Sequence, residues 1–354
     1  MDKLKNSVKE VIHPIVLKLM GKDDVKFAVS ETLKGLLPVK PVLDFKEWDT
    51  SPYPELGKAG SGSKTSERSD IIFITGRFRS GSTFLWNIFR SMEGYKAYYE
   101  PFNEGRWFDP QNRSTKIDST HKNVSNYWEE YRGLEVLCNY YKRSWTNYNL
   151  LMEKCFWNPE MKTFIETIVE HTKNIPVLQF NRIDFRLPWI RHNFINSKII
   201  HLYRHPRDQW CSSLFDINCF SKDGSMEDFI PHDQFYLREW GRNLKYHFPF
   251  LNEKEITHPY EMFYYIWKLS YLFGINYAHF SIGFEKLITD FDEEIKKLFE
   301  FLGIKEYDLC NLRKILVKPD FGKWKNYADE EWFLRIEERC EFVLNDFFEK
   351  VLKS

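Results

Sequence analysis

The chain has 354 residues, enough for one large α/β domain or two small ones with a sizeable hydrophobic core. Lysine plus arginine equals aspartate plus glutamate, at 51 each, so no overall electrostatic field draws the chain to nucleic acid or to an anionic membrane. A site for an anion must therefore be a local concentration of hydrogen-bond donors.

The N-terminal part is expected to be a helical leader followed by a linker. Residues 1–22 carry charges through their first ten positions and only a short apolar stretch, which predicts neither a signal peptide nor a membrane span. The stretch Gly57–Asp70 is rich in glycine, serine and lysine, as linkers are. We therefore expect a leader over residues 1–68 and one α/β domain over residues 69–354, with no transmembrane segment and a cytoplasmic location.

Five strands with connecting helices are expected in chain order. The first, Ile71–Thr75, is apolar throughout, as a parallel strand covered on both faces would be. The others are expected at 95–101, 177–180, 198–203 and within 279–290, and helices at 208–215, at 292–304 and from Ser82 onward. Residues 103–175 are expected to form helices and loops over one edge. Strands alternating with helices predict a parallel β-sheet flanked by helices, with ligands at the carboxyl ends of the strands.

The loop after the first strand, Gly76–Thr83, reads GRFRSGST and nearly matches the phosphate-binding signature G-x-x-x-x-G-K-[ST]. Such a loop presents consecutive backbone N–H groups and the positive end of a helix to an anion. Its two glycines permit a close approach, and its hydroxyls add donors. Ser82 stands where nucleotide-hydrolysing loops have lysine, and the cation of this loop is Arg79 instead.

The strand at 198–203 argues against nucleotide hydrolysis. A nucleotide-hydrolysing enzyme needs an acidic residue at the end of another core strand to hold Mg²⁺. This strand ends in Arg204, which would repel magnesium and attract a second phosphate. A degenerate P-loop kinase or NTPase, and a non-catalytic nucleotide-binding protein, remain the alternatives. The six scattered cysteines form no C-x-x-C pair, and no histidine cluster has metal spacing, which predicts reduced thiols and no metal site.

The loop Gly76–Thr83 and Arg204 after the strand at 198–203 are two predicted anion-binding elements. With both of them, the chain resembles the sulfotransferases that use 3′-phosphoadenosine 5′-phosphosulfate (PAPS). The family's 5′-phosphosulfate loop reads [KR]-S-G-[ST]-[ST], which Arg79–Thr83 fits at every position. Its 3′-phosphate element is a strand followed by an arginine, seven residues and a serine, and Arg204 and Ser212 have this spacing. The resemblance spans residues 70–330 and implies a P-loop-like sulfotransferase fold, PAPS as co-substrate and no metal.

A third match lies downstream, where Val317–Asn326 resembles the family's R-K-G-x-x-G-x-W-K-N segment. Val317 replaces the arginine and Pro319 the first glycine. Trp324 is expected either to close over the base or to anchor its loop, and Phe84 either to stack on the adenine or to pack within its helix. The resemblance implies a nucleotide-binding set of Arg79, Ser80, Gly81, Ser82, Thr83, Phe84, Arg204, Ser212, Lys318, Gly322, Lys323 and Trp324.

Sulfuryl transfer needs a base for the acceptor proton and stabilisation of the charge on the leaving phosphate. Cytosolic members of the family use a histidine near the position of Asn181, where this chain has none. The carbohydrate and protein-tyrosine branches use a glutamate at the end of the second strand, where Glu100 stands. The resemblance therefore implies Glu100 as general base and Arg79 as catalytic cation. The alternatives are Glu104 as the base, or Glu100 as an ion-pair partner of Arg77 or Arg79.

The acceptor is expected to be a small molecule, a carbohydrate or a glycolipid, because the glutamate-type base resembles that branch of the family. Residues 103–175 are expected to shape its pocket. Arg182 and Arg186 would either meet an anionic acceptor or form ordinary ion pairs. His121 and His201 are expected to be structural.

Overall fold

The structure is a computed structural model that describes residues 68–118, 121 and 124–353. The expected leader, and with it the expected boundary at residue 68, lies almost wholly outside these residues. Within the described part of the chain, no helix has the length and apolar character to cross a membrane. All six cysteines are described, and each is a free thiol.

The centre of the molecule is a five-stranded sheet in the order β2-β3-β1-β4-β5, and every strand pair is parallel. The strands are β1 (Ile72–Thr75), β2 (Tyr95–Tyr99), β3 (Ile175–Phe180), β4 (Lys198–Tyr203) and β5 (Phe280–Gly283). Each lies within two residues of its expected position or inside the expected range. The prediction of a parallel α/β sheet flanked by helices, the P-loop-like fold, is confirmed.

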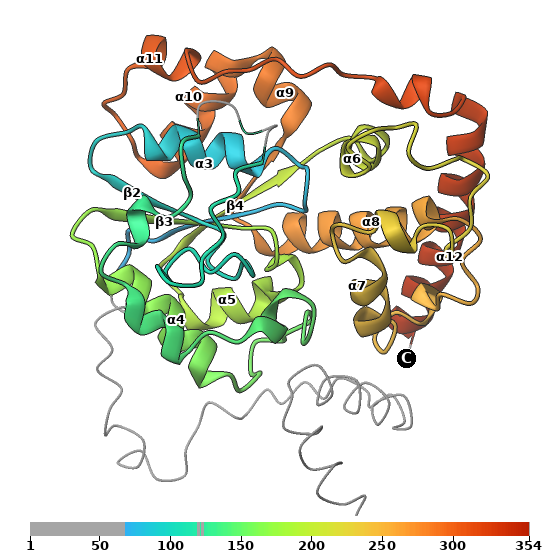
Figure 1. Ribbon diagram of the computed structural model, residues 1–354, viewed down its shortest axis with the longest axis horizontal. Helices are drawn as coiled ribbons and strands as arrows, with labels where there is room; N and C mark the ends of the chain where they lie inside the picture. Colours follow the sequence, from blue (N-terminus) through green and yellow to red (C-terminus); the bar gives the residue numbers. More distant parts are fainter. Residues whose placement is uncertain (1–67, 119–120, 122–123, 354) are drawn as a thin grey trace, which may run out of the picture.

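Helices cover both faces of the sheet (Figure 1). One face carries α3 (Ser82–Arg90), α9 (Phe284–Thr289), α10 (Phe291–Leu302) and α11 (Leu309–Arg313). The opposite face carries α4 (Pro159–Glu170) and α5 (Leu187–Asn193). A lateral group, at the right in Figure 1, consists of α6 (Pro206–Ser213), α7 (Leu237–Leu244), α8 (Pro259–Tyr277) and α12 (Glu330–Lys353).

Local sequence explains where the expected helices begin and end. α3 starts directly after the phosphate-loop glycine and buries Leu85, Trp86, Ile88 and Phe89, which recur at helical spacing. α10 ends at Gly303, which adopts the left-handed conformation with φ 77° that commonly terminates helices. Both helices confirm the predictions made for them.

Residues 103–175 contain little regular structure. Besides α4, they form the short 3₁₀ turns η1 (Glu129–Tyr131), η2 (Glu135–Asn139) and η3 (Arg143–Thr146). Aromatic side chains of this region, including Trp107, Phe108, Tyr127, Tyr131 and Trp145, are buried in the core around the sheet. Most of its aromatic residues therefore fill the core.

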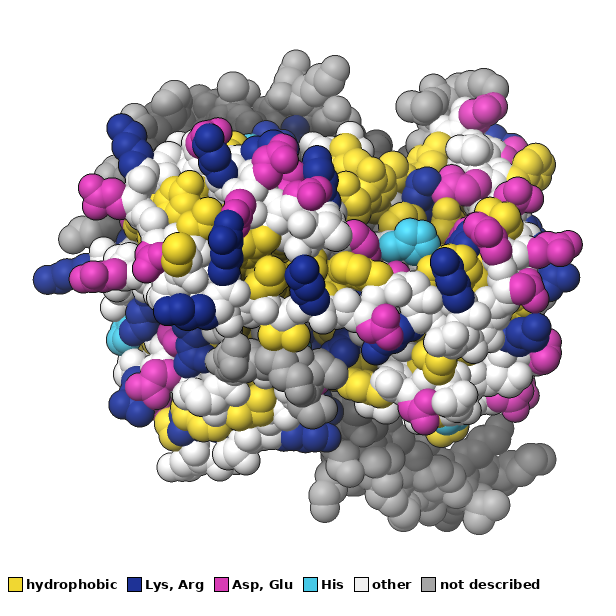
Figure 2. Space-filling view, turned by 90° about the horizontal axis from the view of Figure 1, so that it is seen from above, with side chains coloured by type: hydrophobic (Ala, Val, Ile, Leu, Met, Phe, Trp, Pro, Cys, Tyr) yellow, Lys and Arg dark blue, Asp and Glu magenta, His cyan; other side chains and the backbone are white. Residues whose placement is uncertain are grey.

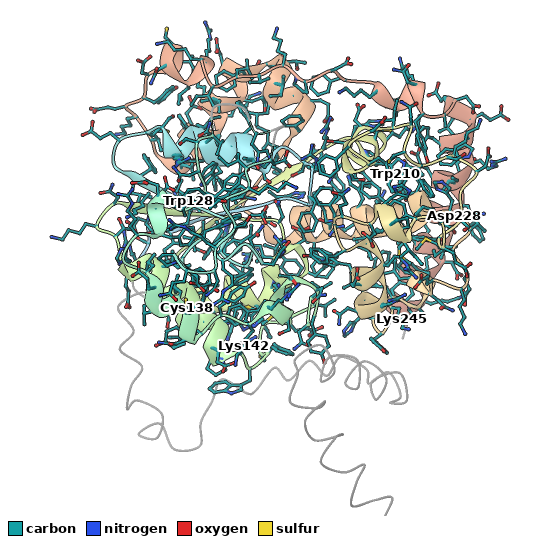
Figure 3. The ribbon with its side chains drawn as sticks, in the orientation of Figure 1. Trp128, Cys138, Lys142, Trp210, Asp228 and Lys245 are labelled. Carbon is teal, nitrogen blue, oxygen red and sulfur yellow. The ribbon has the colours of Figure 1, made fainter. Side chains whose placement is uncertain are left out.

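A second apolar core lies among the lateral helices, around α6, α7, α8 and α12. Trp210, which lies on α6 and is labelled in Figure 3, is fully buried in this core. The remaining 3₁₀ turns are η4 (Asp184–Arg186), η5 (Ile230–His232), η6 (Pro249–Leu251) and η7 (Lys323–Asn326). On the face shown in Figure 2, Lys and Arg side chains alternate with Asp and Glu, so charge of neither sign dominates it.

Candidate active site

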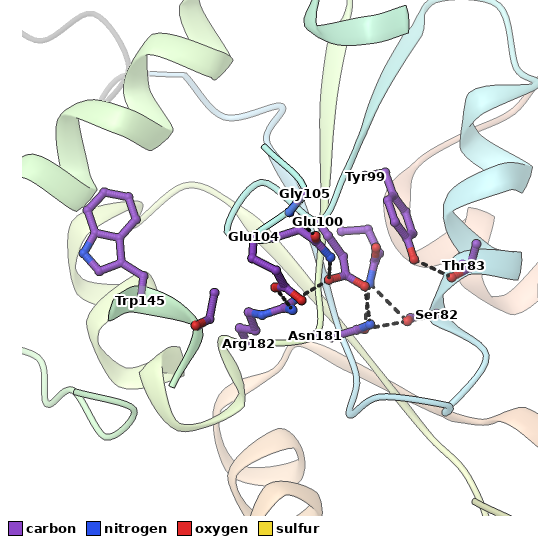
Figure 4. A network of polar contacts seen from close by, with 12 residues as sticks. Ser82, Thr83, Tyr99, Glu100, Glu104, Gly105, Trp145, Asn181 and Arg182 are labelled. Atoms are coloured by element: carbon purple, nitrogen blue, oxygen red, sulfur yellow. Dashed lines mark hydrogen bonds and ion pairs between the residues drawn. The ribbon is translucent and has the colours of Figure 1, made fainter. Parts of the chain in front are cut away.

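The residues that follow β1, β2, β3 and β4 meet at the carboxyl end of the sheet. Because β1 lies between β3 and β4, the loop after β1 stands where the strand order reverses, which is where open parallel sheets bind ligands. Ser82 follows β1, Glu100 follows β2, Asn181 and Arg182 follow β3, and Arg204 follows β4. Figure 4 shows the polar network that joins the first four of these residues.

The phosphate loop needs both of its glycines. A Cβ atom added to Gly76 would lie 2.6 Å from the carbonyl oxygen of Leu202, and one added to Gly81 would lie 2.3 Å from the ring of Phe284. Gly81 has φ 94° and Arg79 has φ 67°, both in the left-handed region that a residue other than glycine rarely adopts. Backbone strain of this kind at a non-glycine residue is concentrated at functional sites.

The loop also carries unpaired hydrogen-bond donors. The N–H groups of Ser82 and Thr83 lie in the first turn of α3, where a helix offers them no carbonyl partner. The hydroxyl of Ser80 is fully buried and has no hydrogen-bond partner among the described residues. A buried polar group without a partner is costly, so a bound anion would relieve this cost.

Arg79, Arg204 and Ser212 come together, although not in the pairing that the resemblance implies. Arg79 Nε donates to both the carbonyl oxygen and the hydroxyl of Ser212, each at 3.1 Å, and its Nη1 pairs with Asp118 at 3.0 Å. Arg204 Nη1 donates to the carbonyl oxygen of Arg79 at 3.1 Å. The Ser212 hydroxyl therefore contacts Arg79 here, whereas the family pattern places it beside Arg204.

Arg204 has the environment of an anion-binding arginine. Its side chain is buried against the ring of Phe284, and its Nε has no hydrogen-bond partner among the described residues. Burial lowers the pKa of Arg204, and the nearby carboxylate of Asp208 partly opposes that shift. A phosphate group would supply both the missing acceptor and a counter-charge, so this position fits the 3′-phosphate of a nucleotide.

The side chain of Asn181 connects Glu100 to the phosphate loop. Asn181 Nδ2 donates to Glu100 Oε1 at 2.5 Å, and Asn181 Oδ1 accepts from the Ser82 hydroxyl at 2.8 Å. Gln179, fully buried on β3, donates to both Ser82 Oγ at 3.0 Å and Asn181 Oδ1 at 2.8 Å. The hydroxyl of Ser82 is therefore engaged within the protein, and this residue offers an anion its backbone N–H.

Arg182 is the ion-pair partner of Glu100, and it also pairs with Glu104 at 2.6 Å. The interpretation of Glu100 as a partner of Arg77 or Arg79 is therefore wrong. Burial would lower the pKa of Arg182, but the two carboxylates outweigh this effect and raise it. Burial likewise pushes the pKa of Glu104 upward, but Arg182 and hydrogen bonds outweigh it and lower the pKa.

The two histidines expected to be structural lie in different places. His121 lies at the site, with Nε2 3.2 Å from Thr83 Oγ1 and Nδ1 2.5 Å from the hydroxyl of Tyr127. Burial lowers its pKa to about 4, despite an opposing effect of Asp118, so it is neutral at pH 7. His201 lies inside β4, buried against α8, away from the strand ends.

Arg186 is fully buried and holds backbone in place. Its guanidinium donates to the carbonyl oxygens of Trp145, Tyr148, Asn149 and Arg182 at 2.7–3.1 Å. Burial lowers its pKa to about 9. A fully buried Arg186 does not fit the expected contact with an anionic acceptor. The alternative, ordinary ion pairs, is not found either, because the partners of Arg186 are carbonyl oxygens.

The segment Val317–Asn326, the third match to the family, packs against residues that follow β4. The N–H of Gly322 donates to both carboxylate oxygens of Asp208, at 2.9 and 3.1 Å. Trp324 is stacked over His205, with 6.4 Å between ring centroids, and the guanidinium of Arg207 lies 4.7 Å from its ring. These contacts favour the interpretation in which Trp324 anchors its loop.

Three other members of the implied nucleotide set have less defined surroundings. Phe84 is half-buried and packs against Phe291, with ring centroids 6.1 Å apart. This contact favours packing of Phe84 against a neighbouring helix over stacking on the adenine. Lys318 and Lys323 are exposed on the segment between α11 and α12. Their part in nucleotide binding stays a prediction.

Sequence reasoning missed the roles of Gln179, Asn181 and Arg182. Asn181 and Arg182 directly follow β3, so the rule that parallel strands end at one edge could have placed them beside Glu100. Gln179 is a polar residue in an otherwise apolar strand, which is the signal that could have revealed it. Among the described residues, no three His, Cys, Asp or Glu side chains are grouped as a metal site would require.

Comparisons with known proteins give one family. Residues 70–308 match the model of the Sulfotransferase family. Similar solved structures include the sulfotransferase domain from the curacin biosynthetic pathway, at 16% identity over 70% of this chain and 78% of that one, with a TM-score of 0.37. Another is the sulfotransferase domain from the Synechococcus PCC 7002 olefin synthase, at 15% identity, 77% and 86% coverage and a TM-score of 0.34. A third is the mouse sulfotransferase SULT7A1 complexed with PAP, at 14% identity, 82% and 92% coverage and a TM-score of 0.36. No curated protein matches the chain.

Proposed function

The chain belongs to the sulfotransferase family, and from this premise we propose that it transfers the sulfuryl group of PAPS to an acceptor hydroxyl, with Glu100 as the general base. One observation carries the proposal: the four strand ends are joined by hydrogen bonds into a single site. Arg204 is bonded to the backbone of Arg79, and Asn181 links Ser82 to Glu100. Donors for two anionic groups and a carboxylate therefore lie at one edge of the sheet.

In this proposal the nucleotide supplies the SO₃ group, and the protein supplies two anchors for it. The 5′-phosphosulfate would be held by the backbone N–H groups of the phosphate loop, by the unpaired hydroxyl of Ser80 and by Arg79. The 3′-phosphate would be held by Arg204, whose Nε lacks a partner among the described residues. The product nucleotide would be adenosine 3′,5′-bisphosphate.

Glu100 would take the proton of the acceptor hydroxyl as the hydroxyl oxygen attacks sulfur in line with the breaking S–O bond. Three donors orient its carboxylate: Asn181 on Oε1, and Asn103 and Arg182 on Oε2. Arg79 would stabilise the negative charge that develops on the leaving phosphate. On the family resemblance, the hydroxyl belongs to a carbohydrate or a glycolipid.

Nucleotide selectivity tests the first half of the proposal. We expect adenosine 3′,5′-bisphosphate to raise the melting temperature without added metal, and AMP, which lacks the 3′-phosphate, to raise it much less. Thermal unfolding with each ligand in the presence of EDTA measures this difference. Equal shifts for the two ligands would contradict the two-anchor site. Stabilisation by ATP that requires Mg²⁺ would instead support a P-loop kinase.

Turnover by Glu100→Gln tests the second half. We expect transfer of ³⁵S from PAPS to fall by about 10²-fold or more, while the affinity for adenosine 3′,5′-bisphosphate stays within about twofold. Glu170→Gln is the matched control. Glu170 is exposed at the end of α4, shortly before β3 begins, so it lies near the amino ends of the strands and away from the candidate site. Full activity of Glu100→Gln together with loss of activity in Glu104→Gln would move the base to Glu104. A wild-type protein that binds nucleotide but sulfates no acceptor in a broad panel would indicate a non-catalytic binding protein.

A further inference from the structure

Four aromatic rings lie together at the rim of the candidate site, and we name them the aromatic cluster: Phe78, Phe215, Phe235 and Tyr236. Phe78 comes from the phosphate loop, and the other three come from the segment between α6 and α7. Phe215 is stacked on Phe235, with centroids 5.6 Å apart and planes at 27°. The ring of Phe78 lies 5.4 Å from Phe235 and 6.4 Å from Tyr236.

The cluster extends between the two arginines that flank the reacting groups. The guanidinium of Arg79 lies 5.1 Å from the ring of Phe215 and 5.9 Å from Phe235. The guanidinium of Arg182, which pairs with Glu100, lies 4.9 Å from Phe78 and 5.9 Å from Tyr236. A molecule that places a hydroxyl beside Glu100 would therefore have the aromatic cluster next to it.

Exposure and backbone conformation distinguish this cluster from ordinary core packing. Phe215 is 49% exposed, although it is a large apolar side chain. Phe215 has φ 60° and Tyr236 has φ 59°, in the left-handed region that bulky residues rarely adopt. Such conformations are energetically unfavourable and persist where the surrounding structure imposes them, which is often at binding sites.

A small cavity continues the cluster toward the second core. Its walls include Phe78 and Phe235 together with Phe229, Phe263, Trp210 and Arg77. The walls also include the polar side chains of Ser213, His232, Asp233 and Gln234. Beside the exposed ring of Phe215, the wall therefore combines aromatic rings with polar side chains, as ligand pockets commonly do.

We propose that the aromatic cluster binds the apolar part of the acceptor, so that the acceptor is amphipathic and carries its hydroxyl beside an apolar ring or chain. This inference rests on the proposed sulfuryl transfer. A small free sugar can lay only its C–H face on the rings of Phe215 and Phe235, which buries little apolar area. An apolar group in the same place would gain from burial against the rings. Of the acceptors implied by the family, a glycolipid fits this surface and an unsubstituted sugar does not.

Two glucosides that share their reacting hydroxyls test the inference: 2-naphthyl β-D-glucopyranoside and methyl β-D-glucopyranoside. Their binding is measured by titration calorimetry with the protein saturated by adenosine 3′,5′-bisphosphate. We expect the naphthyl compound to bind at least about tenfold more tightly, and Phe215→Ala to reduce that ratio about threefold or more. Phe342→Ala is the matched control, because Phe342 is an even more exposed phenylalanine, located on α12. Phe342→Ala should not change the affinity for the nucleotide.

The outcomes separate this inference from the proposed function. Equal binding of the two glucosides, binding of neither, or the same loss in Phe342→Ala overturns the aromatic cluster as an acceptor surface, and tight nucleotide binding would then leave the proposed function standing. Preferential naphthyl binding without any nucleotide binding supports the cluster and contradicts the proposed function. A change of oligomeric state in Phe215→Ala, measured by analytical ultracentrifugation with naphthyl binding intact, would assign the cluster to a protein contact and also overturn the inference.

Discussion

Arg204 holds a buried guanidinium whose Nε has no acceptor among the described residues. Without a ligand, this burial is only partly compensated, by a hydrogen bond to the backbone of Arg79, by contact with Phe284 and by the nearby carboxylate of Asp208. A ligand that brings a phosphate to this position removes that cost and gains a charge-assisted hydrogen bond. The energetic effect of this residue should thus appear in ligand binding more than in folding.

We predict that Arg204→Ala weakens binding of adenosine 3′,5′-bisphosphate by on the order of 2–5 kcal/mol, because the 3′-phosphate loses its buried partner. The affinity for AMP should change little. Titration calorimetry with both nucleotides measures the difference, and Arg191→Ala, at an exposed arginine of α5, is the control. A loss below about 0.5 kcal/mol for the bisphosphate would show that Arg204 does not bind the 3′-phosphate.

At this scale, the sequence predicts what is local and misses what depends on neighbouring strands. Arg79 and Arg204 could be found because each follows a recognisable strand and loop. The pairing of Glu100 with Arg182 is not local, because 82 positions separate the two residues and it depends on β2 and β3 lying side by side. For the same reason, the loop sequence predicts that the Ser82 hydroxyl donates to the anion. In the structure this hydroxyl donates to Asn181, which follows β3.

Among the elements, β4 and α8 meet closely at one point. Gly274 of α8 faces His201 of β4, and a Cβ atom at position 274 would lie 2.3 Å from the imidazole ring. The glycine therefore allows the helix to approach the sheet, and the histidine is buried in the contact with its Nδ1 3.3 Å from Ser281 Oγ. Burial lowers the pKa of His201 to about 4.

We predict that this contact makes stability depend on pH. The unfolded chain has a histidine pKa of about 6.5 and so binds a proton that the folded state excludes between about pH 6.5 and pH 4. The contribution is complete above pH 6.5 and is lost as the pH falls, by up to about 3 kcal/mol for a shift of this size. Urea unfolding at pH 7 and pH 4.5 should show a smaller loss for His201→Asn than for the wild type. His171→Asn, at an exposed histidine, should retain the wild-type loss, and an unchanged loss in His201→Asn would contradict the prediction.

The elements recovered from sequence are those with a clear pattern. β1 and β4 are short apolar runs, and α10 has one apolar face and a terminal glycine. α8 was not predicted, because it is buried over much of its length and its aromatic residues do not follow a single face. Few helix or strand boundaries can be predicted within residues 103–175. Their core side chains come from 3₁₀ turns and irregular segments, in which apolar residues do not recur at a helix or strand period.

At the scale of the whole molecule, Arg207 connects α6, the helix that follows β4, to the C-terminal helix α12. It lies on α6, donates to Glu337 of α12 at 2.7 and 2.8 Å, and packs over Trp324. Tyr260 of α8 donates to the same carboxylate at 2.5 Å. Helices from three parts of the chain therefore share one partly buried polar contact at the lateral core, beside the segment that Trp324 anchors.

We predict that Arg207→Ala lowers the free energy of unfolding by about 1–3 kcal/mol, because it leaves the Glu337 carboxylate without its cation and removes the packing over Trp324. The midpoint of urea unfolding measures the effect. Arg335→Ala, which removes an exposed arginine of α12, should leave the midpoint nearly unchanged. Similar midpoints for both variants would mean that the contact contributes little to stability.

The segment between α6 and α7 has a consequence for how this enzyme could diversify. It supplies three of the four rings of the aromatic cluster but contributes no strand to the sheet. Its exchange would replace the surface offered to the acceptor while Glu100, Asn181 and Arg204 stay on their strand ends. Under the two proposals above, nucleotide chemistry and acceptor choice would be encoded in separable stretches of one chain, so that a graft of this single connection between relatives should transfer substrate preference without changing the strand ends.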